Sequence, residues 1–337
     1  MTLLQTKVKA VALISSGLDS LLAAKIVKDL DIDVQGVHFF FQFDSINKED
    51  REREIEKTAG PLNIPVSIVD ISEDFLDILI NPEHGYGSQI NPCIDCRLHM
   101  LHKAQKMMMQ IGAQFIVTGE IVGQRPMTQN KPTLFHIDKA SGLKGRILRP
   151  LSAKLLPPTL PEEKGWIDRN KLYGLSGRSR KPQLAMAEEL GISHYSQPGV
   201  GCILTDPGYA KRVKSLFSHK QKKEITVEEL KLLRFGRHFW PKDNLQVIVG
   251  RDEKDNLSLE AFQSGRWVFY PLDHQGPLVL AVGIKYESEI KLIAGITARY
   301  SSGNKSSPLR IKYKGNGKEG TILGTPIPDS ELEKWRV

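Results

Sequence analysis

The sequence predicts an α/β protein with a doubly wound parallel sheet, followed by a second, smaller α+β domain. Two observations predict the sheet. Apolar runs of strand length alternate with segments whose apolar residues recur at helical spacing, and this alternation is typical of right-handed βαβ units. The first run, 8–14, is almost entirely apolar, as expected for a strand buried on both faces. The second domain is predicted from a change of pattern near residue 225, after which short strand-like segments and turns follow one another.

The expected elements follow in order along the chain. Strands are expected over 8–14, 34–41, 64–71 and 113–120, and helices over 19–30, 49–63, 97–112 and 181–192. The Pro-rich stretch 155–170 reads as a connecting loop. A strongly basic stretch, 211–224, marks the expected junction, so we predict one domain over 1–215 and another over 225–337.

Composition narrows the class of protein. The chain has 337 residues and a formal net charge of +8, which favours a polyanionic partner and equally describes an ordinary basic protein. No apolar run approaches the roughly 20 residues that span a bilayer. The first residues read as a strand rather than a signal peptide, because their apolar run leads directly into a Ser/Gly turn. We therefore expect a cytoplasmic protein with no membrane partner.

The turn after the first strand, "ISSGLDS" at 14–20, is the first candidate site. A Ser/Gly-rich turn between a strand and a helix exposes backbone N–H groups at a helix N-terminus, where phosphate binds readily. The sequence is neither a Walker loop nor a dinucleotide fingerprint. The plainer interpretation is a simple turn with Asp19 or Ser20 near the start of the helix.

This turn resembles the PP-loop of the N-type ATP pyrophosphatases. Ser15, Gly17, Asp19 and Ser20 match the motif, and Ser16 replaces its first glycine. The resemblance implies that Ser15, Ser20 and the amides of the loop, including those of Ser16 and Gly17, hold the pyrophosphate of ATP. It also implies that Asp19 handles Mg²⁺. In this family a carbonyl oxygen of the acceptor attacks the α-phosphate, and the resulting adenylate later loses AMP to a nucleophile.

Three cysteines form the second candidate site. Cys93 and Cys96 make a Cys-x-x-Cys, and Cys202 lies far along the chain. Metal ligation or thiol chemistry is favoured over a disulfide framework, which three cysteines cannot complete. A structural zinc site would need a fourth ligand, for which His99 and His102 are available. Three buried structural thiols are the remaining interpretation.

Four pieces in order resemble the tRNA-thiolating branch of the PP-loop ATPases, over roughly residues 5–215: 15–20, 91–96, 112–120 and 199–206. In the tRNA 2-thiouridylases the cysteines matching Cys96 and Cys202 transfer sulfur. In the cluster-dependent tRNA thiolases a Cys-x-x-Cys and a distant cysteine hold a [4Fe-4S] cluster with one iron open. Cys93, Cys96 and Cys202 supply that set. The alternative is cluster-free, with a persulfide on Cys202, assistance from Cys96, and Cys93 as a passive core residue.

The resemblance thus implies ATP-dependent thiolation of a uridine in tRNA, with ATP, Mg²⁺ and a [4Fe-4S] cluster. The sulfur donor would be cysteine desulfurase-derived sulfur or inorganic sulfide. Two other classes stay open: a non-catalytic RNA-binding protein whose loop has decayed, and a PP-loop ligase or amidotransferase acting on a small molecule. The sequence determines neither the target uridine nor its ring position.

Further residues are expected around this site. The resemblance places Thr118 and Gly119 beside the nucleotide, with Glu120 where relatives often carry histidine. Gln124 and Arg125 are expected to contact phosphate or RNA, or Arg125 forms a surface ion pair. Three more basic residues precede a predicted helix: Arg178, Arg180 and Lys181. They are expected either to make bidentate contacts to phosphate or to form a solvated basic turn.

The C-terminal part resembles the NFACT-R domain, through 236–239 and 248–256. Its aromatic and cationic run, 237–240, suits stacking on unpaired bases. Alternatively, Phe239 and Trp240 pack the small core and Arg251 caps a turn. Basic residues expected to extend an RNA track are Lys211, Arg212, Lys214, Lys220, Lys222 and Lys223.

Overall fold

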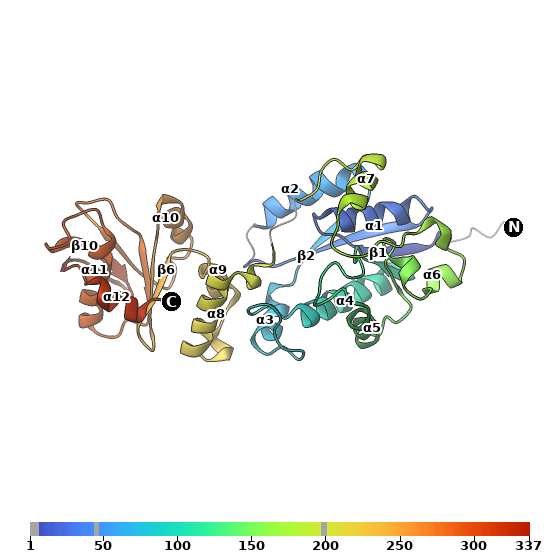
Figure 1. Cartoon of the computed structure of the whole chain (residues 1–337). Coiled ribbons are helices and arrows are strands. Elements are labelled where there is room, and N and C mark those ends of the chain that lie inside the picture. Colours follow the sequence, from blue (N-terminus) through green and yellow to red (C-terminus); the bar gives the residue numbers. More distant parts are fainter. Residues whose placement is uncertain (1–6, 44–46, 197–200) are drawn as a thin grey trace. The chain divides into compact units, whose positions relative to one another are not determined.

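The computed structural model describes residues 7–43, 47–196 and 201–337 (Figure 1). The chain divides into two compact units, Met1–Thr205 and Asp206–Val337. Each unit has its own sheet and its own core, and each is described by itself below.

The first unit contains a five-stranded sheet in the order β3-β2-β1-β4-β5. Every pairing in it is parallel. The strands are β1 (Lys9–Leu13), β2 (Asp33–Phe40), β3 (Val66–Asp70), β4 (Phe115–Val117) and β5 (Ile147–Leu148). The order runs outward in both directions from the β1–β4 pair, so the carboxyl ends of these two strands flank the crevice in which doubly wound sheets bind ligands. The predicted parallel α/β fold is confirmed.

Helices cover both faces of this sheet (Figure 1). One face carries α1 (Leu18–Lys28), α2 (Lys48–Ala59) and α7 (Lys181–Glu189), and the other carries α3 (Ser72–Ile80), α4 (Cys93–Gln110) and α5 (Lys131–Ala140). Strand β1 shows why. Ala10 and Ala12 pack into the core on the first face, whereas Val11 and Leu13 pack into the core on the second. Alternate side chains of a strand point to opposite faces, so an all-apolar strand requires cover on both sides.

Two local expectations in this unit are wrong in detail. The helix expected from residue 97 begins at Cys93, with Pro92 preceding its first turn and the Cys96 N–H donating to the Pro92 carbonyl at 2.8 Å. Both cysteines therefore lie in the first turn of α4. The expected loop 155–170 contains a short helix, α6 (Leu160–Glu163). A capping box between Thr159 and Glu162 stabilises its N-terminus.

The second unit is an antiparallel sheet of six strands with helices, which confirms the predicted smaller α+β part. Its strand order is β11-β10-β8-β9-β7-β6. Its strands are β6 (Arg237–Lys242), β7 (Leu245–Val249), β8 (Trp267–Pro271), β9 (Val279–Val282), β10 (Leu309–Gly315) and β11 (Lys318–Gly324). Its helices are α8 (Pro207–His219), α9 (Val227–Leu232), α10 (Glu253–Glu260), α11 (Glu287–Tyr300) and α12 (Asp329–Trp335).

Helix α8 takes up most of the basic stretch that was expected to be a junction. The buried Tyr209 hydroxyl donates to the Leu230 carbonyl at 2.8 Å, and Arg212 Nε donates to the Leu233 carbonyl at 2.6 Å. Because these bonds join α8 to the end of α9, α8 packs as part of the second unit. This describes packing, and the functional division into 1–215 and 225–337 stays a prediction.

Membrane-spanning helices require both length and apolar character. Within the part of the chain that the structure describes, no helix combines the two.

Candidate active site

The turn between β1 and α1 is held by its own serine side chains. Ser20 Oγ lies 2.9 Å from the carbonyls of both Ser15 and Gly17, and it accepts the Ser15 N–H at 3.0 Å. Ser15 Oγ in turn accepts the Gly17 N–H at 3.2 Å. These bonds fix the backbone of the turn at the start of α1, the position where a helix offers unpaired N–H groups to an anion.

Ser16, which departs from the glycine of the motif, has a defined structural partner. Its side chain is buried, and its Oγ is hydrogen-bonded to Ser196 Oγ. The Ser196 N–H donates to the Ser16 carbonyl at 2.7 Å, and Ser196 Oγ also donates to Glu54 on α2 at 2.5 Å. The hydroxyl at position 16 thus attaches the turn to the segment that leads to Cys202.

The two carboxylate oxygens of Asp19 differ in their hydrogen bonding. Gln124 Nε2 donates to Oδ2 at 2.8 Å. Oδ1 is buried and has no hydrogen-bond partner among the described residues. A buried carboxylate oxygen without a partner is unfavourable unless a cation or donor is supplied. Asp19 at the start of α1 therefore fits the expected Mg²⁺, which prefers carboxylate oxygens beside phosphate.

The end of β4 presses directly against this turn. A Cβ on Gly119 would lie 2.5 Å from the Ser20 nitrogen and 2.6 Å from the Asp19 carbonyl oxygen. Both atoms belong to the backbone, which cannot move aside as a flexible side chain could. Only glycine at position 119 permits this approach.

Gly119→Ala is accordingly expected to destabilise the first unit by about 1–3 kcal/mol, the usual effect of overpacking, and to weaken ATP binding. Urea denaturation and nucleotide titration measure the two effects. Gly60→Ala is the matched control, because Gly60 has helical backbone angles and the nearest atom to its Cβ is 4.0 Å away. Equal stability of the two variants would show that the close approach at Gly119 is unimportant.

Glu120 forms a buried ion-pair network. Its Oε1 lies 2.9 Å from Arg97 Nε, and its Oε2 lies 2.9 Å from Arg149 Nε. Arg149 also makes two hydrogen bonds to Asp138, at 2.9 and 2.6 Å. Burial by itself would raise the pKa of the Glu120 carboxyl, but the two guanidinium groups outweigh it and lower that pKa to about 2. Glu120 is thus a charged anchor between the end of β4 and the residue after Cys96.

Cys93 and Cys202 both lie near enough to Cys96 to affect its ionisation. All three lie in the described part of the chain, and none is in a disulfide. Cys93 and Cys96 are half-buried, whereas Cys202 is exposed. Burial raises the pKa of the Cys96 thiol, and the neighbouring sulfurs of Cys202 and Cys93 raise it further. The loops also meet directly, since the Ile90 N–H donates to the Leu204 carbonyl at 3.3 Å.

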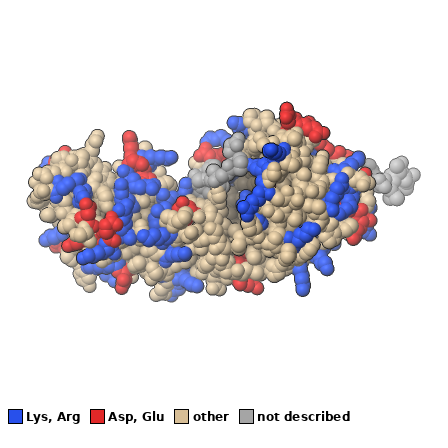
Figure 2. Space-filling view, in the orientation of Figure 1, with Lys and Arg blue, Asp and Glu red and all other residues tan. Residues whose placement is uncertain are grey.

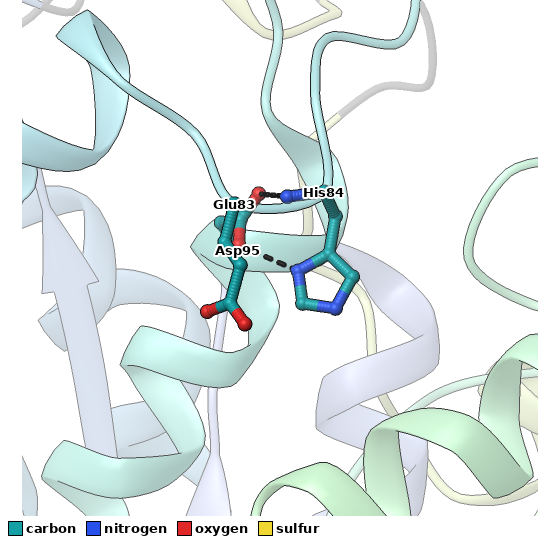
Figure 3. A group of neighbouring side chains, drawn as sticks. All are labelled: Glu83, His84 and Asp95. Carbon is teal, nitrogen blue, oxygen red and sulfur yellow. Dashed lines mark hydrogen bonds and ion pairs between the residues drawn. The ribbon is translucent and has the colours of Figure 1, made fainter.

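The side chains of Glu83, His84 and Asp95 form a polar group (Figure 3). Asp95, between Cys93 and Cys96, accepts His84 Nδ1 at 2.7 Å and the His84 backbone N–H at 3.0 Å. The ligand atoms of Glu83, His84 and Asp95 lie within 4.8 Å of one another, so the group could hold a divalent cation. Its hydrogen bonds alone already tie the loop before α4 to the first turn of the helix.

Other candidates are distributed around the same edge of the sheet. Arg125 is exposed and lowers the pKa of Cys93, against the larger effect of burial. The turn before α7, which carries Arg178 and Arg180, approaches this region because the Gly177 N–H donates to the Val122 carbonyl at 2.8 Å. His38 is a buried core histidine that bonds the Ile14 carbonyl, as expected. Roles for these arginines and for Lys181 stay predictions.

Sequence reasoning missed several partners in the site. Arg97, Arg149, Ser196 and Glu54 carry no motif of their own, and they are recognised only through the side chains they contact. The position of Arg97 directly after Cys96 was the one available signal.

The base-stacking role expected for the run 237–240 is wrong for its central residues. Phe239 and His238 are buried, and Phe239 packs in the core against α11. Burial lowers the pKa of His238 to about 3, so the ring is neutral, and it bonds the Phe235 carbonyl. Arg251 instead pairs with Asp255, at 2.5 and 3.0 Å. Phe239 therefore packs in the core of the second unit, as the alternative interpretation held for this residue.

Two of the six residues expected in the RNA track are likewise engaged within the second unit. Arg212 bonds the Leu233 carbonyl, and Lys220 forms an ion pair with Glu229. The other four stay candidates.

The parallel sheet, with its Ser/Gly turn between β1 and α1, has the architecture of a PP-loop domain. Comparison with known proteins shows which family models the two units match. Residues 5–154 match the family model described as "Thiamine biosynthesis protein (ThiI)", and residues 236–336 match the "NFACT protein RNA binding domain". The chain is therefore similar to the ThiI family over residues 5–154 and to the NFACT-R domain over residues 236–336.

Curated relatives match a shorter region. The tRNA-specific 2-thiouridylase MnmA of Desulfosudis oleivorans is 31% identical over 111 residues, 32% of this chain and 30% of that protein. The enzyme of the same name from Campylobacter jejuni is 30% identical over 115 residues, 33% of this chain and 34% of that protein. The chain thus matches only about a third of the length of these relatives.

Solved structures are more distant. A 4-thiouridine synthetase–RNA complex with bound ATP aligns with a TM-score of 0.36 and 20% identity, over 55% of this chain and 51% of that one. The U34-tRNA thiolase NcsA from Methanococcus maripaludis, with its [4Fe-4S] cluster, aligns with a TM-score of 0.35 and 15% identity, over 68% and 74%.

Proposed function

We propose that this protein uses ATP to replace a carbonyl oxygen of a tRNA uridine with sulfur. One series of contacts carries the proposal. Gly119 lies against the backbone of Asp19 and Ser20 in the phosphate turn, and the next residue, Glu120, pairs with Arg97 beside Cys96. Adenylation and sulfur delivery require these two sites to be adjacent. The curated relatives are named as tRNA 2-thiouridylases, which agrees with tRNA as the substrate.

The reaction we propose has two steps. The uridine carbonyl oxygen first attacks the α-phosphorus of ATP, and the bond to pyrophosphate breaks. The amides of the turn, with Ser15 and Ser20, bind the departing pyrophosphate. Asp19, whose Oδ1 has no hydrogen-bond partner among the described residues, would hold Mg²⁺, which would stabilise the charge on the phosphates. A sulfur nucleophile then attacks the ring carbon that carries this oxygen. The carbon–oxygen bond breaks, and AMP leaves with the original oxygen.

We further propose that Cys93, Cys96 and Cys202 hold a [4Fe-4S] cluster. Support comes from the donor set, because thiolates are the ligands that iron–sulfur clusters prefer and each cysteine ligates a separate iron. When bound, such a cluster offers one open iron to a hydrosulfide. Cys202 is the exposed member of this donor set, whereas Cys93 and Cys96 are half-buried.

The cluster-free alternative keeps the same adenylation step. Cys202 would carry a persulfide whose outer sulfur attacks the ring, and Cys96 would resolve it as a disulfide that a reductant must reopen. The exposure of Cys202 and its proximity to Cys96 agree with this route as well. The two routes differ in Cys93, which only the cluster requires.

The test is pyrophosphate release measured with and without tRNA, together with mass spectrometry of the tRNA nucleosides. We expect release only with tRNA, and a new thionucleoside when sulfide is supplied. Asp19→Asn is expected to abolish both, whereas Lys254→Ala, on an exposed face of α10, should change neither. Release of pyrophosphate with a small-molecule acceptor but not with tRNA would contradict the proposal.

Cys93→Ser separates the two sulfur routes. If the cluster operates, the anaerobically purified protein should contain about four iron atoms and absorb broadly near 400 nm, and the variant should lose iron, absorption and thiolation together. A colourless protein that thiolates tRNA at full rate, with an equally active Cys93→Ser variant, would assign the persulfide route.

The C-terminal unit is proposed to bind the tRNA. Its match to a domain described as RNA binding supports this role, and so does the excess of Lys and Arg over Asp and Glu within residues 206–337, 23 against 16. We place the functional boundary as predicted, with catalysis in 1–215 and RNA binding in 225–337.

A further inference from the structure

A cavity of about 250 Å³ lies within the second unit. Helix α8, strand β6 and the end of α12 line it through Lys211, Ser215, His219, Trp240, Lys334, Trp335, Arg336 and Val337. Lys211, Ser215 and His219 are four residues apart in succession, so they share one face of α8. We call this cavity the α8–α12 pocket.

Aromatic rings form one part of the pocket. The His219 ring stacks on the Trp240 indole with centroids 4.2 Å apart and planes 9° apart. His219 Nδ1 lies 2.8 Å from the Ser215 carbonyl, which can only accept, so Nδ1 is the donor. In the neutral ring, Nε2 is then left as an acceptor. Trp335 is half-buried and packs against the core, which holds its indole at the wall of the pocket.

Cations form the other part. Lys211 and Lys334 are exposed, and neither side chain makes an ion pair or hydrogen bond with any described residue. Among the residues that the structure describes, the exposed Arg336 pairs with Glu333, at 2.8 Å. Lys and Arg side chains are also abundant on the surface of this unit in Figure 2. The pocket therefore has uncompensated positive charge at its rim.

We propose that the α8–α12 pocket binds one nucleotide of single-stranded RNA, an inference that rests on tRNA being the substrate. The volume admits one nucleobase. The rings offer a flat stacking surface that tolerates any base, and the lysines lie where the flanking phosphates would pass. An acidic peptide would use the lysines but would leave the rings and the His219 acceptor without a function. The pocket thus identifies which part of the second unit contacts RNA, after the run 237–240 has been shown to be largely structural.

The first experiment compares two double charge reversals in the full-length protein. Lys211→Glu with Lys334→Glu changes the pocket, and Lys254→Glu with Lys291→Glu makes the same change in net charge at exposed positions on α10 and α11 that do not line it. Binding of a fluorescent single-stranded oligoribonucleotide is measured by polarisation over a range of salt concentrations. We expect the pocket variant to bind at least about tenfold more weakly than the control variant, with a salt slope smaller by about 0.7 for each phosphate that the pocket no longer neutralises.

The second experiment tests the base. Trp335→Leu is expected to weaken binding of the oligoribonucleotide by about tenfold, and to leave binding of an abasic analogue of the same length unchanged. Quenching of tryptophan emission by the oligoribonucleotide should decrease in the same variant. Circular dichroism verifies its folding, and the lysine variants test the pocket independently if it does not fold.

The outcomes separate this inference from the proposed function. If both charge-reversed proteins bind RNA equally while the protein still thiolates tRNA, the pocket is not the RNA site and the proposed function stands. If the wild-type protein binds neither oligonucleotide, the inference is overturned directly. If Trp335→Leu weakens binding of both probes equally, the pocket recognises phosphate alone, and the base-stacking role is refuted.

Discussion

Cys202→Ser is expected to abolish thiouridine formation while pyrophosphate release in the presence of tRNA continues. The reason is that Cys202 lies with Cys96 and Cys93 rather than in the phosphate turn, so its replacement removes sulfur delivery and leaves adenylation intact. A serine oxygen is neither a good ligand for iron nor able to carry a persulfide. Nucleoside mass spectrometry and a pyrophosphate assay on the same samples measure the two steps separately.

The contrast with Asp19→Asn makes this result specific. That variant should lose both steps, because Asp19 lies in the phosphate turn itself. Two results would contradict the assignment of Cys202: thiouridine formed at the wild-type rate, or loss of pyrophosphate release together with thiolation.

Glu120→Gln is expected to destabilise the first unit by about 3–5 kcal/mol, the usual effect of removing one member of a buried ion pair. The substitution preserves volume but leaves two buried guanidinium groups with less negative charge. Arg149 retains Asp138 as a partner, so the uncompensated charge is chiefly that of Arg97. We expect Arg97 to move when it loses this charged partner. Because Arg97 directly follows Cys96, such a movement should also weaken sulfur delivery. Urea denaturation and the thiolation assay measure these effects.

Glu52→Gln provides the matched control. Glu52 pairs with Lys48 on the exposed face of α2, with N and O atoms 3.7 Å apart. Exposed pairs of this spacing contribute about 0.3–0.5 kcal/mol, so the same chemical change should hardly alter stability there. If Glu120→Gln is as stable as Glu52→Gln, Glu120 is not the anchor that the geometry indicates.

Much of the fold and part of the site follow from local sequence patterns. The apolar run before the first turn predicts a strand buried on both faces, and Val11 and Ala12 indeed pack on opposite sides of β1. The Ser/Gly turn and the three cysteines could be predicted as candidate site residues, because a Ser/Gly-rich turn before a helix is typical of phosphate binding and a Cys-x-x-Cys is typical of metal or thiol chemistry. Strand β5, only Ile147–Leu148, is too short to show a period and was not predicted.

Ser16 and Glu120 show where sequence reasoning stops. From the sequence, Ser16 is only a departure from a motif. In the structure its hydroxyl is hydrogen-bonded to Ser196, 180 residues along the chain. Glu120 looked like an unexplained replacement of histidine until Arg97 and Arg149 were found beside it. Neither partner is marked by spacing or residue type.

By itself, the sequence predicted the alternation of strands and helices, and it singled out the Ser/Gly turn after the first strand and the three cysteines as candidate site residues. Only the tertiary structure decided that Gly119 meets the phosphate turn, that Glu120 is a buried anchor, and that Phe239 belongs to a core rather than to a stacking surface. The physical reason is that periodicity and turn chemistry act between near neighbours in the chain. The burial of a side chain and the partner of a charge depend on segments that folding brings together from far apart.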